Sequence, residues 1–140
     1  MLISRKEIAV RYQETDQMGV VYHANYLVWF EIGRTSFIEE LGFTYPEMED
    51  SGVLLPVIDA GLTYHKPARY GDTVYVETSI RKYAGIRLTY DYEVKSEDGD
   101  LLVSGYTEHT FTTKETFRPI QLRKVNKEWH ESLLRVIKGE

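Results

Sequence analysis

Residues 12–41, YQETDQMGVVYHANYLVWFEIGRTSFIEEL, decide the fold, because they join a polar loop to a long apolar helix. From Tyr26 to Leu41 the chain has one glycine and no proline, and it starts with a dense apolar run. Gly42 follows at once, and glycine is the usual residue just past a helix C-terminus. The first half of the segment is apolar nearly all round, which is typical of a helix buried on several sides. We therefore expect a long core helix over residues 26–41.

The segments around this helix alternate between apolar and polar residues, as strands with one buried face do. Tight-turn residues at Ala84-Gly85 and Asp98-Gly99 predict antiparallel hairpins between the later strands. The expected strands cover residues 7–12, 54–64, 74–81, 86–95 and 101–113. One long helix against a five-stranded antiparallel sheet is an α+β arrangement of two layers. The helix covers one face, so we expect the other, rich in Tyr and Val, to serve in association.

The end of the chain predicts one more helix. Apolar residues recur there at helical spacing, and Asn126 is a suitable N-cap, so we expect a C-terminal helix over residues 126–138. No linker or internal repeat divides the chain, which predicts a single domain over residues 1–140.

Composition excludes several functions. The chain has no cysteine, so it has no disulfide, thiolate metal site or cysteine nucleophile. Its net charge of -5 argues against nucleic acid as a partner. No apolar run approaches the roughly 20 residues that span a bilayer, and the first ten residues do not resemble a secretion signal. We expect a cytoplasmic protein with no membrane span.

The loop before the long helix carries the candidate chemistry. Free N–H groups at a helix N-terminus stabilise an oxygen that gains negative charge, and a nearby carboxylate can act as general base or nucleophile. Asp16 lies in this loop, seven residues before His23. Position alone also fits a turn residue for Asp16 and a structural role for His23. Asn25 is a good N-cap by residue type, which would place the first free amides at Tyr26 and beyond.

The run Tyr12–Tyr26, continued by Leu27, Trp29, Phe30 and Glu31, resembles the signature of hot-dog-fold acyl-CoA thioesterases of the 4-hydroxybenzoyl-CoA thioesterase type. That type includes the group associated with the bacterial Tol–Pal cluster. A second segment, YHKPARYGD at residues 64–72, resembles another recognisable part of the family, and the strand series fits to about Thr113.

The resemblance implies a hot-dog fold, in which the sheet wraps around one central helix, and acyl-CoA hydrolysis without cofactor or metal. It implies that Asp16 is the catalytic acid and that the backbone amide of His23 polarises the thioester carbonyl. The resemblance also implies that the side chains of Tyr12 and His23 belong to the active site, as the matching residues do in related members. It further implies an active site at a two-fold interface, and hence a homodimer or homotetramer. The acyl carrier is CoA or an acyl-carrier protein.

Basic side chains near strand ends are candidates for binding the CoA phosphates. These residues are Lys66, Arg69, Arg81, Lys82 and Arg87. Each is equally well explained as a charge that keeps a strand edge soluble.

Other functions fit the sequence less well. A hot-dog hydratase also combines an acid with a histidine, but its Asp-x-Asn-Pro-x-His pattern is absent here. No Gly-x-Ser-x-Gly elbow supports a serine hydrolase, and the four histidines lack metal-ligand spacing. A non-catalytic acyl-CoA-binding module with the same fold stays open, since fold alone does not give function. Thiol release from acyl-CoA distinguishes the two.

Overall fold

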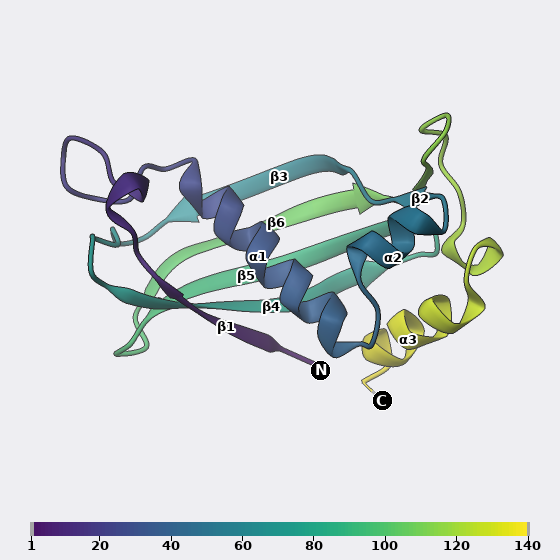
Figure 1. Cartoon of the computed structure of the whole chain (residues 1–140). Helices are drawn as coiled ribbons and strands as arrows, with labels where there is room; N and C mark the ends of the chain where they lie inside the picture. Colours follow the sequence, from purple (N-terminus) through teal and green to yellow (C-terminus); the bar gives the residue numbers. More distant parts are fainter. Residues whose placement is uncertain (1, 140) are drawn as a thin grey trace.

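The computed structural model describes residues 2–139 (Figure 1). The helices are α1 (Asn25–Glu40), α2 (Tyr45–Asp50) and α3 (Lys127–Ile137), with single 3-10 turns at Tyr12–Glu14 and Leu122–Lys124. The strands are β1 (Ser4–Ala9), β2 (Val53–Leu54), β3 (Val57–Tyr64), β4 (Thr73–Tyr83), β5 (Arg87–Ser96), β6 (Leu101–Thr110) and β7 (Thr112–Thr113).

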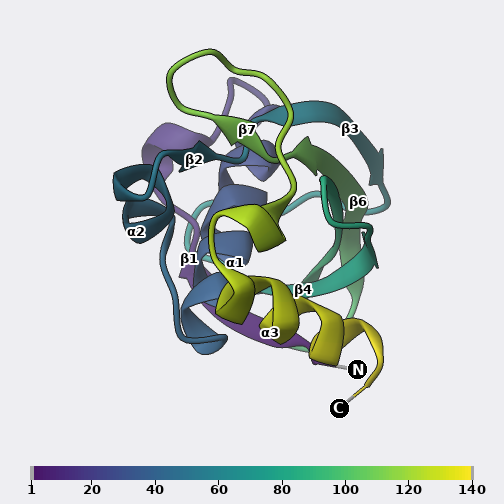
Figure 2. The same ribbon diagram turned by 90° about the vertical axis from the view of Figure 1, so that its right-hand side faces the viewer.

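Five strands form one antiparallel sheet in the order β1-β4-β5-β6-β3, and β2 pairs separately with β7. Helix α1 runs diagonally across one face of this sheet (Figure 1), and the end-on view shows the sheet curving around it (Figure 2). The expected α+β hot-dog arrangement is confirmed. The loop between β1 and α1 lies at one end of α1, and α3 lies at the other (Figure 1).

Aromatic side chains fill the space between α1 and the sheet. Trp29, Phe30 and Phe37 have no exposed surface, and the Phe30 ring stacks on Tyr92 with centroids 4.2 Å apart. Gly33 lets the helix approach β4 closely, because a Cβ there would lie 2.5 Å from Thr78 Oγ1. The burial of this apolar layer holds α1 in place, and with it the loop that precedes the helix.

The two faces of the sheet differ from the expectation. Val76 of β4 and Tyr92 of β5 are buried on the side that faces α1, whereas the outer face carries charged side chains such as Glu77, Arg81 and Asp91. The expected Tyr- and Val-rich free face is therefore wrong. The apolar set belongs to the covered side because the alternation along each strand puts one residue set on each face.

Element boundaries shift at several places. The first strand ends at Ala9, before the expected limit of residue 12, because the chain turns into a 3-10 helix at Tyr12. Helix α2 was not expected, although Thr44 accepts a hydrogen bond from the Glu47 N–H and is its N-cap. The C-terminal helix is confirmed, with the Asn126 side chain accepting from the Trp129 N–H at 3.0 Å.

Within residues 2–139, none of the helices has both the length and the apolar character needed to cross a membrane.

Candidate active site

The chain around Asp16 forms a tight turn. The Asp16 Oδ1 accepts a hydrogen bond from the Met18 N–H at 2.8 Å, and its carbonyl oxygen accepts from the Gly19 N–H at 3.0 Å. Gly19 has a φ of +79°, a conformation that glycine adopts without strain. These bonds fix the position of the carboxylate, and its Oδ2 has no partner among the hydrogen bonds of residues 2–139.

This turn is attached to the second recognisable segment of the sequence. Val20 forms a β-bridge with Arg69, and the Val21 N–H donates to the Ala68 carbonyl at 2.9 Å. The bridge explains why two segments some fifty residues apart in sequence belong to one site.

The N-terminus of α1 offers unpaired amides. The Tyr22 carbonyl accepts from the Asn25 N–H at 2.9 Å, so the His23 N–H, on the opposite side of the same peptide plane, points away from the helix. Within residues 2–139, neither the His23 N–H nor the Ala24 N–H donates a hydrogen bond. The Tyr64 hydroxyl donates to the His23 carbonyl at 3.1 Å and so fixes the next peptide plane.

Asn25, a suitable N-cap by residue type, does not cap α1. The helix begins at Asn25, and Ala24 occupies the cap position with helical backbone angles. The Asn25 side chain instead donates to the Glu14 carbonyl at 2.8 Å. Because no side chain caps this helix, the N–H groups of His23 and Ala24, just before its first residue, remain available to another acceptor.

Asp16 lies between two hollows. The first, about 280 Å³, is lined by Asp16, His23, Tyr26, Tyr64 and Lys66, with Met18 and Pro67 among its apolar walls. The second, about 650 Å³, is lined by Asp16 together with Tyr12, Tyr22 and Asn25. The structure thus brings Asp16 together with His23 on one side and with Tyr12 on the other.

Tyrosines form much of the first hollow. Tyr26 is 2% exposed, its hydroxyl accepts from the Ala68 N–H at 3.3 Å, and burial raises the pKa of this phenol, which therefore stays neutral. The Tyr64 ring meets Tyr26 edge-on at 5.7 Å. Tyr12, by contrast, is 74% exposed, and its ring forms a T-shaped pair with Tyr70 at 5.7 Å between centroids.

The predicted CoA-binding residues fall into two groups. Lys66 lines the first hollow and pairs with Asp100 at 3.4 Å, and Arg69 lies beside Val20. Arg81, Lys82 and Arg87 lie at the other end of β4 and β5, roughly 25 Å along the strand from Thr73 at about 3.3 Å per residue. Arg81 pairs there with Asp91, and Arg87 with Glu108 at 3.5 Å. Of these five predicted residues, Lys66 and Arg69 lie near Asp16 of the same chain, and the other three do not.

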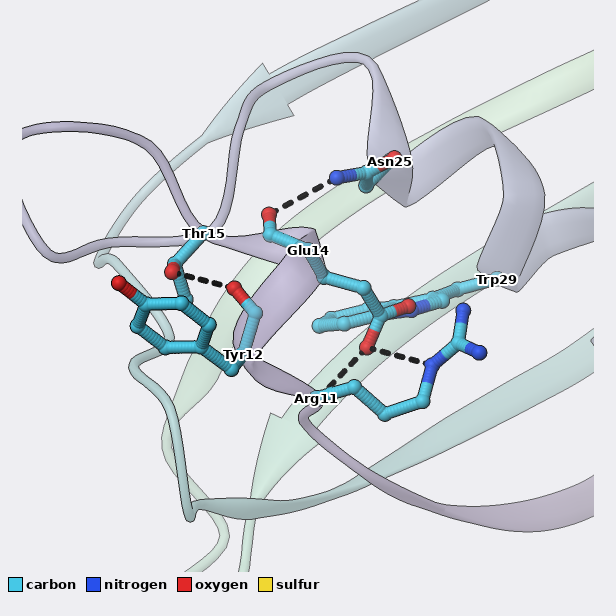
Figure 3. A network of polar contacts seen from close by, with 6 residues as sticks. All are labelled: Arg11, Tyr12, Glu14, Thr15, Asn25 and Trp29. Atoms are coloured by element: carbon cyan, nitrogen blue, oxygen red, sulfur yellow. Dashed lines mark hydrogen bonds and ion pairs between the residues drawn. The ribbon is translucent and has the colours of Figure 1, made fainter.

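Glu14 was given no role from the sequence, yet it is the most connected residue of the loop (Figure 3). It is 6% exposed, and its Oε2 accepts from the indole N–H of Trp29 at 2.8 Å. A carboxylate beside Gln13 and Thr15 in a loop carries no pattern that predicts burial, so no sequence signal could have found it.

Residues 2–139 bring together no group of three or more histidine and carboxylate side chains that could hold a metal ion.

Comparisons with known proteins give the family of the chain. The model of the thioesterase superfamily matches residues 18–103. The candidate acyl-CoA thioesterase YneP of Bacillus subtilis is 51% identical over 130 residues, 93% of this chain and 94% of its own. The acyl-CoA thioester hydrolase YbgC of Escherichia coli is 30% identical over 98 residues, 70% of this chain and 73% of its own. The crystal structure of a DHNA-CoA thioesterase from Staphylococcus aureus is 42% identical, with a TM-score of 0.96 over 99% of this chain and 93% of its own.

Proposed function

The chain belongs to the thioesterase superfamily, and on that basis we propose that it hydrolyses the thioester of an acyl-CoA to a free acid and CoA. The single observation that carries the site assignment is the hollow that Asp16 and His23 share at the start of α1. Asp16 and His23 both line this hollow, and the backbone N–H of His23, just before α1, donates no hydrogen bond within residues 2–139. This pairing supplies the two elements that acyl transfer requires, a base or nucleophile and a donor for the oxyanion.

We propose that the thioester carbonyl oxygen accepts a hydrogen bond from the His23 N–H while Asp16 acts on the carbonyl carbon. In one form, Asp16 takes a proton from water, the water oxygen bonds to that carbon, and the C–S bond breaks to release the CoA thiol. In the other, an Asp16 oxygen bonds to that carbon, the C–S bond breaks to expel the CoA thiolate, and water then hydrolyses the resulting anhydride to the free acid and the Asp16 carboxylate. A single turnover in ¹⁸O-labelled water separates them, because label in Asp16 requires covalent attack.

We propose an aromatic acyl group as the substrate. The hollow beside Asp16 is lined by the rings of Tyr26, Tyr64 and His23, which favour contact with a flat ring. A protein of 42% identity and nearly the same fold is named for DHNA-CoA, whose acyl group is 1,4-dihydroxy-2-naphthoyl. Lys66 and Arg69, beside the same hollow, are the proposed contacts for the CoA phosphates.

We propose that two copies of the chain complete the site. Helix α1 exposes Leu27, Val28 and Ile32, and β3 exposes Val57 and Ile58. Strand β3 is also an edge strand, so its outer N–H and C=O groups have no strand partner among residues 2–139. A second copy would cover this apolar surface, as the homodimer or homotetramer requires. The Arg81, Lys82 and Arg87 group could then meet CoA only as the partner's residues.

We also propose a thioesterase type and a cellular location for the protein. We place the protein with the thioesterases of the 4-hydroxybenzoyl-CoA type, since Asp16, which matches their catalytic acid, lies in the loop before α1. A cytoplasmic location is proposed because a CoA ester is the substrate. Relation to the Tol–Pal group and use of an acyl-carrier protein stay predictions.

Thiol release from a panel of CoA esters tests the function. We expect turnover of DHNA-CoA and benzoyl-type esters above that of acetyl-CoA and palmitoyl-CoA, with an acyl-carrier-protein ester as a further arm. Binding of every ester without release of thiol would instead indicate a non-catalytic binding module. Faster release from aliphatic esters would overturn the aromatic assignment while leaving the reaction intact.

A further inference from the structure

We propose that Glu14 is a positioning residue that sets the separation between the Asp16 carboxylate and the His23 amide. The inference rests on the proposed function, because it concerns the geometry of that reaction. Glu14 does not line either hollow beside Asp16, so it acts through the residues it holds. Its side chain contacts Arg11 and Trp29, and its backbone carbonyl contacts the residues at the start of α1.

The backbone of Glu14 holds the amide side of the site. Its carbonyl oxygen accepts a hydrogen bond from the Tyr22 N–H at 2.8 Å. It also accepts one from Asn25 Nδ2 at 2.8 Å (Figure 3). Tyr22 directly precedes His23, and Asn25 is the first residue of α1. One carbonyl therefore fixes both the peptide before the proposed oxyanion donor and the start of the helix.

The side chain of Glu14 holds the loop against the core. Its Oε1 accepts from the Arg11 N–H at 2.8 Å, and its Oε2 accepts from Trp29 Nε1 at 2.8 Å. Trp29 has no exposed surface and lies one turn into α1, so it is a rigid anchor. The Arg11 guanidinium lies 3.6 Å from Oε1 and balances part of the charge.

Asp16 follows Glu14 by two residues, and Thr15 between them is held by the Tyr12 carbonyl, which accepts from the Thr15 hydroxyl at 2.6 Å (Figure 3). The chain from Glu14 to Asp16 thus has little freedom. A shift of Glu14 would move Asp16 and His23 relative to each other, whereas the walls contributed by residues 64–67 would keep their place. The expected consequence is a loss of turnover without a loss of substrate affinity.

A carboxylate is required because two N–H donors meet its two oxygens. Glutamine offers only one oxygen, and its NH₂ group would face either the Arg11 N–H or the indole N–H, donor against donor. Glu14→Gln therefore keeps the size of the side chain and disrupts one of the two contacts. It is the most specific test of the carboxylate.

The test compares steady-state kinetics of Glu14→Gln, Asp16→Asn and Leu133→Ala with the parent protein. Leu133 is fully buried on α3, at the opposite end of α1, so Leu133→Ala controls for lost stability. We expect kcat of Glu14→Gln to fall about 10- to 100-fold, as a displaced reacting group does, with KM changed less than about 3-fold. Leu133→Ala should keep both constants.

The Trp29 indole gives a readout that does not depend on activity. In a proton–nitrogen NMR spectrum, its Nε1–H resonance should move upfield in Glu14→Gln, while that of Trp129, far from the loop on α3, stays in place. If Glu14→Gln does not fold, Asn25→Ala removes one of the two donors to the Glu14 carbonyl and should lower kcat by a smaller factor.

The outcomes separate the two proposals. Unchanged kcat in Glu14→Gln and Asn25→Ala, with Asp16→Asn inactive, overturns the positioning role and leaves the reaction intact. Equal loss of kcat in Leu133→Ala also overturns it, because general destabilisation would then suffice. Normal turnover in Asp16→Asn overturns the proposed function itself.

Discussion

His109 should make the stability of the fold depend on pH. Its side chain is 1% exposed on β6, and burial lowers its pKa from 6.5 to about 4, with the positive charge of Arg34 acting in the same direction. In the neutral form of the ring, each nitrogen has a hydrogen-bond partner. Nδ1 lies 3.1 Å from the Leu55 carbonyl, and Nε2 lies 2.8 Å from the Thr107 hydroxyl, which also contacts the Tyr92 hydroxyl at 2.6 Å.

The sign follows from linkage. The unfolded chain takes up the proton near pH 6.5, whereas the folded chain resists it until about pH 4, so the stability from this residue is complete above pH 6.5 and is lost as the pH falls to 4. At about 1.4 kcal/mol for each pH unit between the two values, the loss is about 2 kcal/mol at pH 5 and about 3 kcal/mol at pH 4.

Urea unfolding of the parent protein and of His109→Gln at pH 7 and pH 5 measures this term. Glutamine does not titrate, so carboxylate titration common to both proteins cancels in the comparison. We expect the parent to lose about 2 kcal/mol more than the variant between the two pH values. Equal losses of unfolding free energy in the two proteins would show that protonation of His109 does not cause the destabilisation at low pH. A larger loss in the variant would refute the reasoning.

Three further perturbations test the packing, the proposed association and the proposed CoA contacts. Gly33→Ala should destabilise the fold by about 1–3 kcal/mol in urea unfolding, because its Cβ would lie 2.5 Å from Thr78 Oγ1; adding Thr78→Ala should restore part of this, and an unchanged midpoint would contradict the close packing. Val28→Glu should shift the protein toward the monomer in sedimentation equilibrium, because it puts a charge on the exposed apolar side of α1, while the distant Lys138→Glu should not. Lys66→Glu should raise KM for CoA esters more than it lowers kcat, and an unchanged KM would reassign Lys66 to solubility.

Periodicity was enough to predict most of the fold. The strands and α3 follow from the spacing of apolar residues, the hairpins from their turn residues, and the long helix from an apolar run without proline that ends before Gly42. The free face of the sheet was assigned wrongly because alternation gives two residue sets without stating which one the helix covers. Helix α2 was missed because it is a short turn whose capping residues also fit a loop.

The candidate site was predictable only in part. The resemblance pointed to Asp16, His23 and Tyr12, and the structure brings the first two to one hollow and the third to its neighbour. Glu14 and Tyr64 were not predicted as site residues. The Tyr64 contact joins residues far apart in the chain, and Glu14 is a buried carboxylate of a residue type that is usually exposed. Contacts between residues far apart in the chain do not produce a pattern in the spacing of neighbouring residues.

Turnover by Asp16→Asn tests the central claim most directly. Asparagine keeps the oxygen that accepts from the Met18 N–H, so the turn should persist while the negative charge is lost. Thiol release from the best CoA ester should fall at least about 100-fold, with substrate binding retained in calorimetry. A kcat within about 3-fold of the parent value would contradict the account, because neither base nor nucleophile would then reside at residue 16.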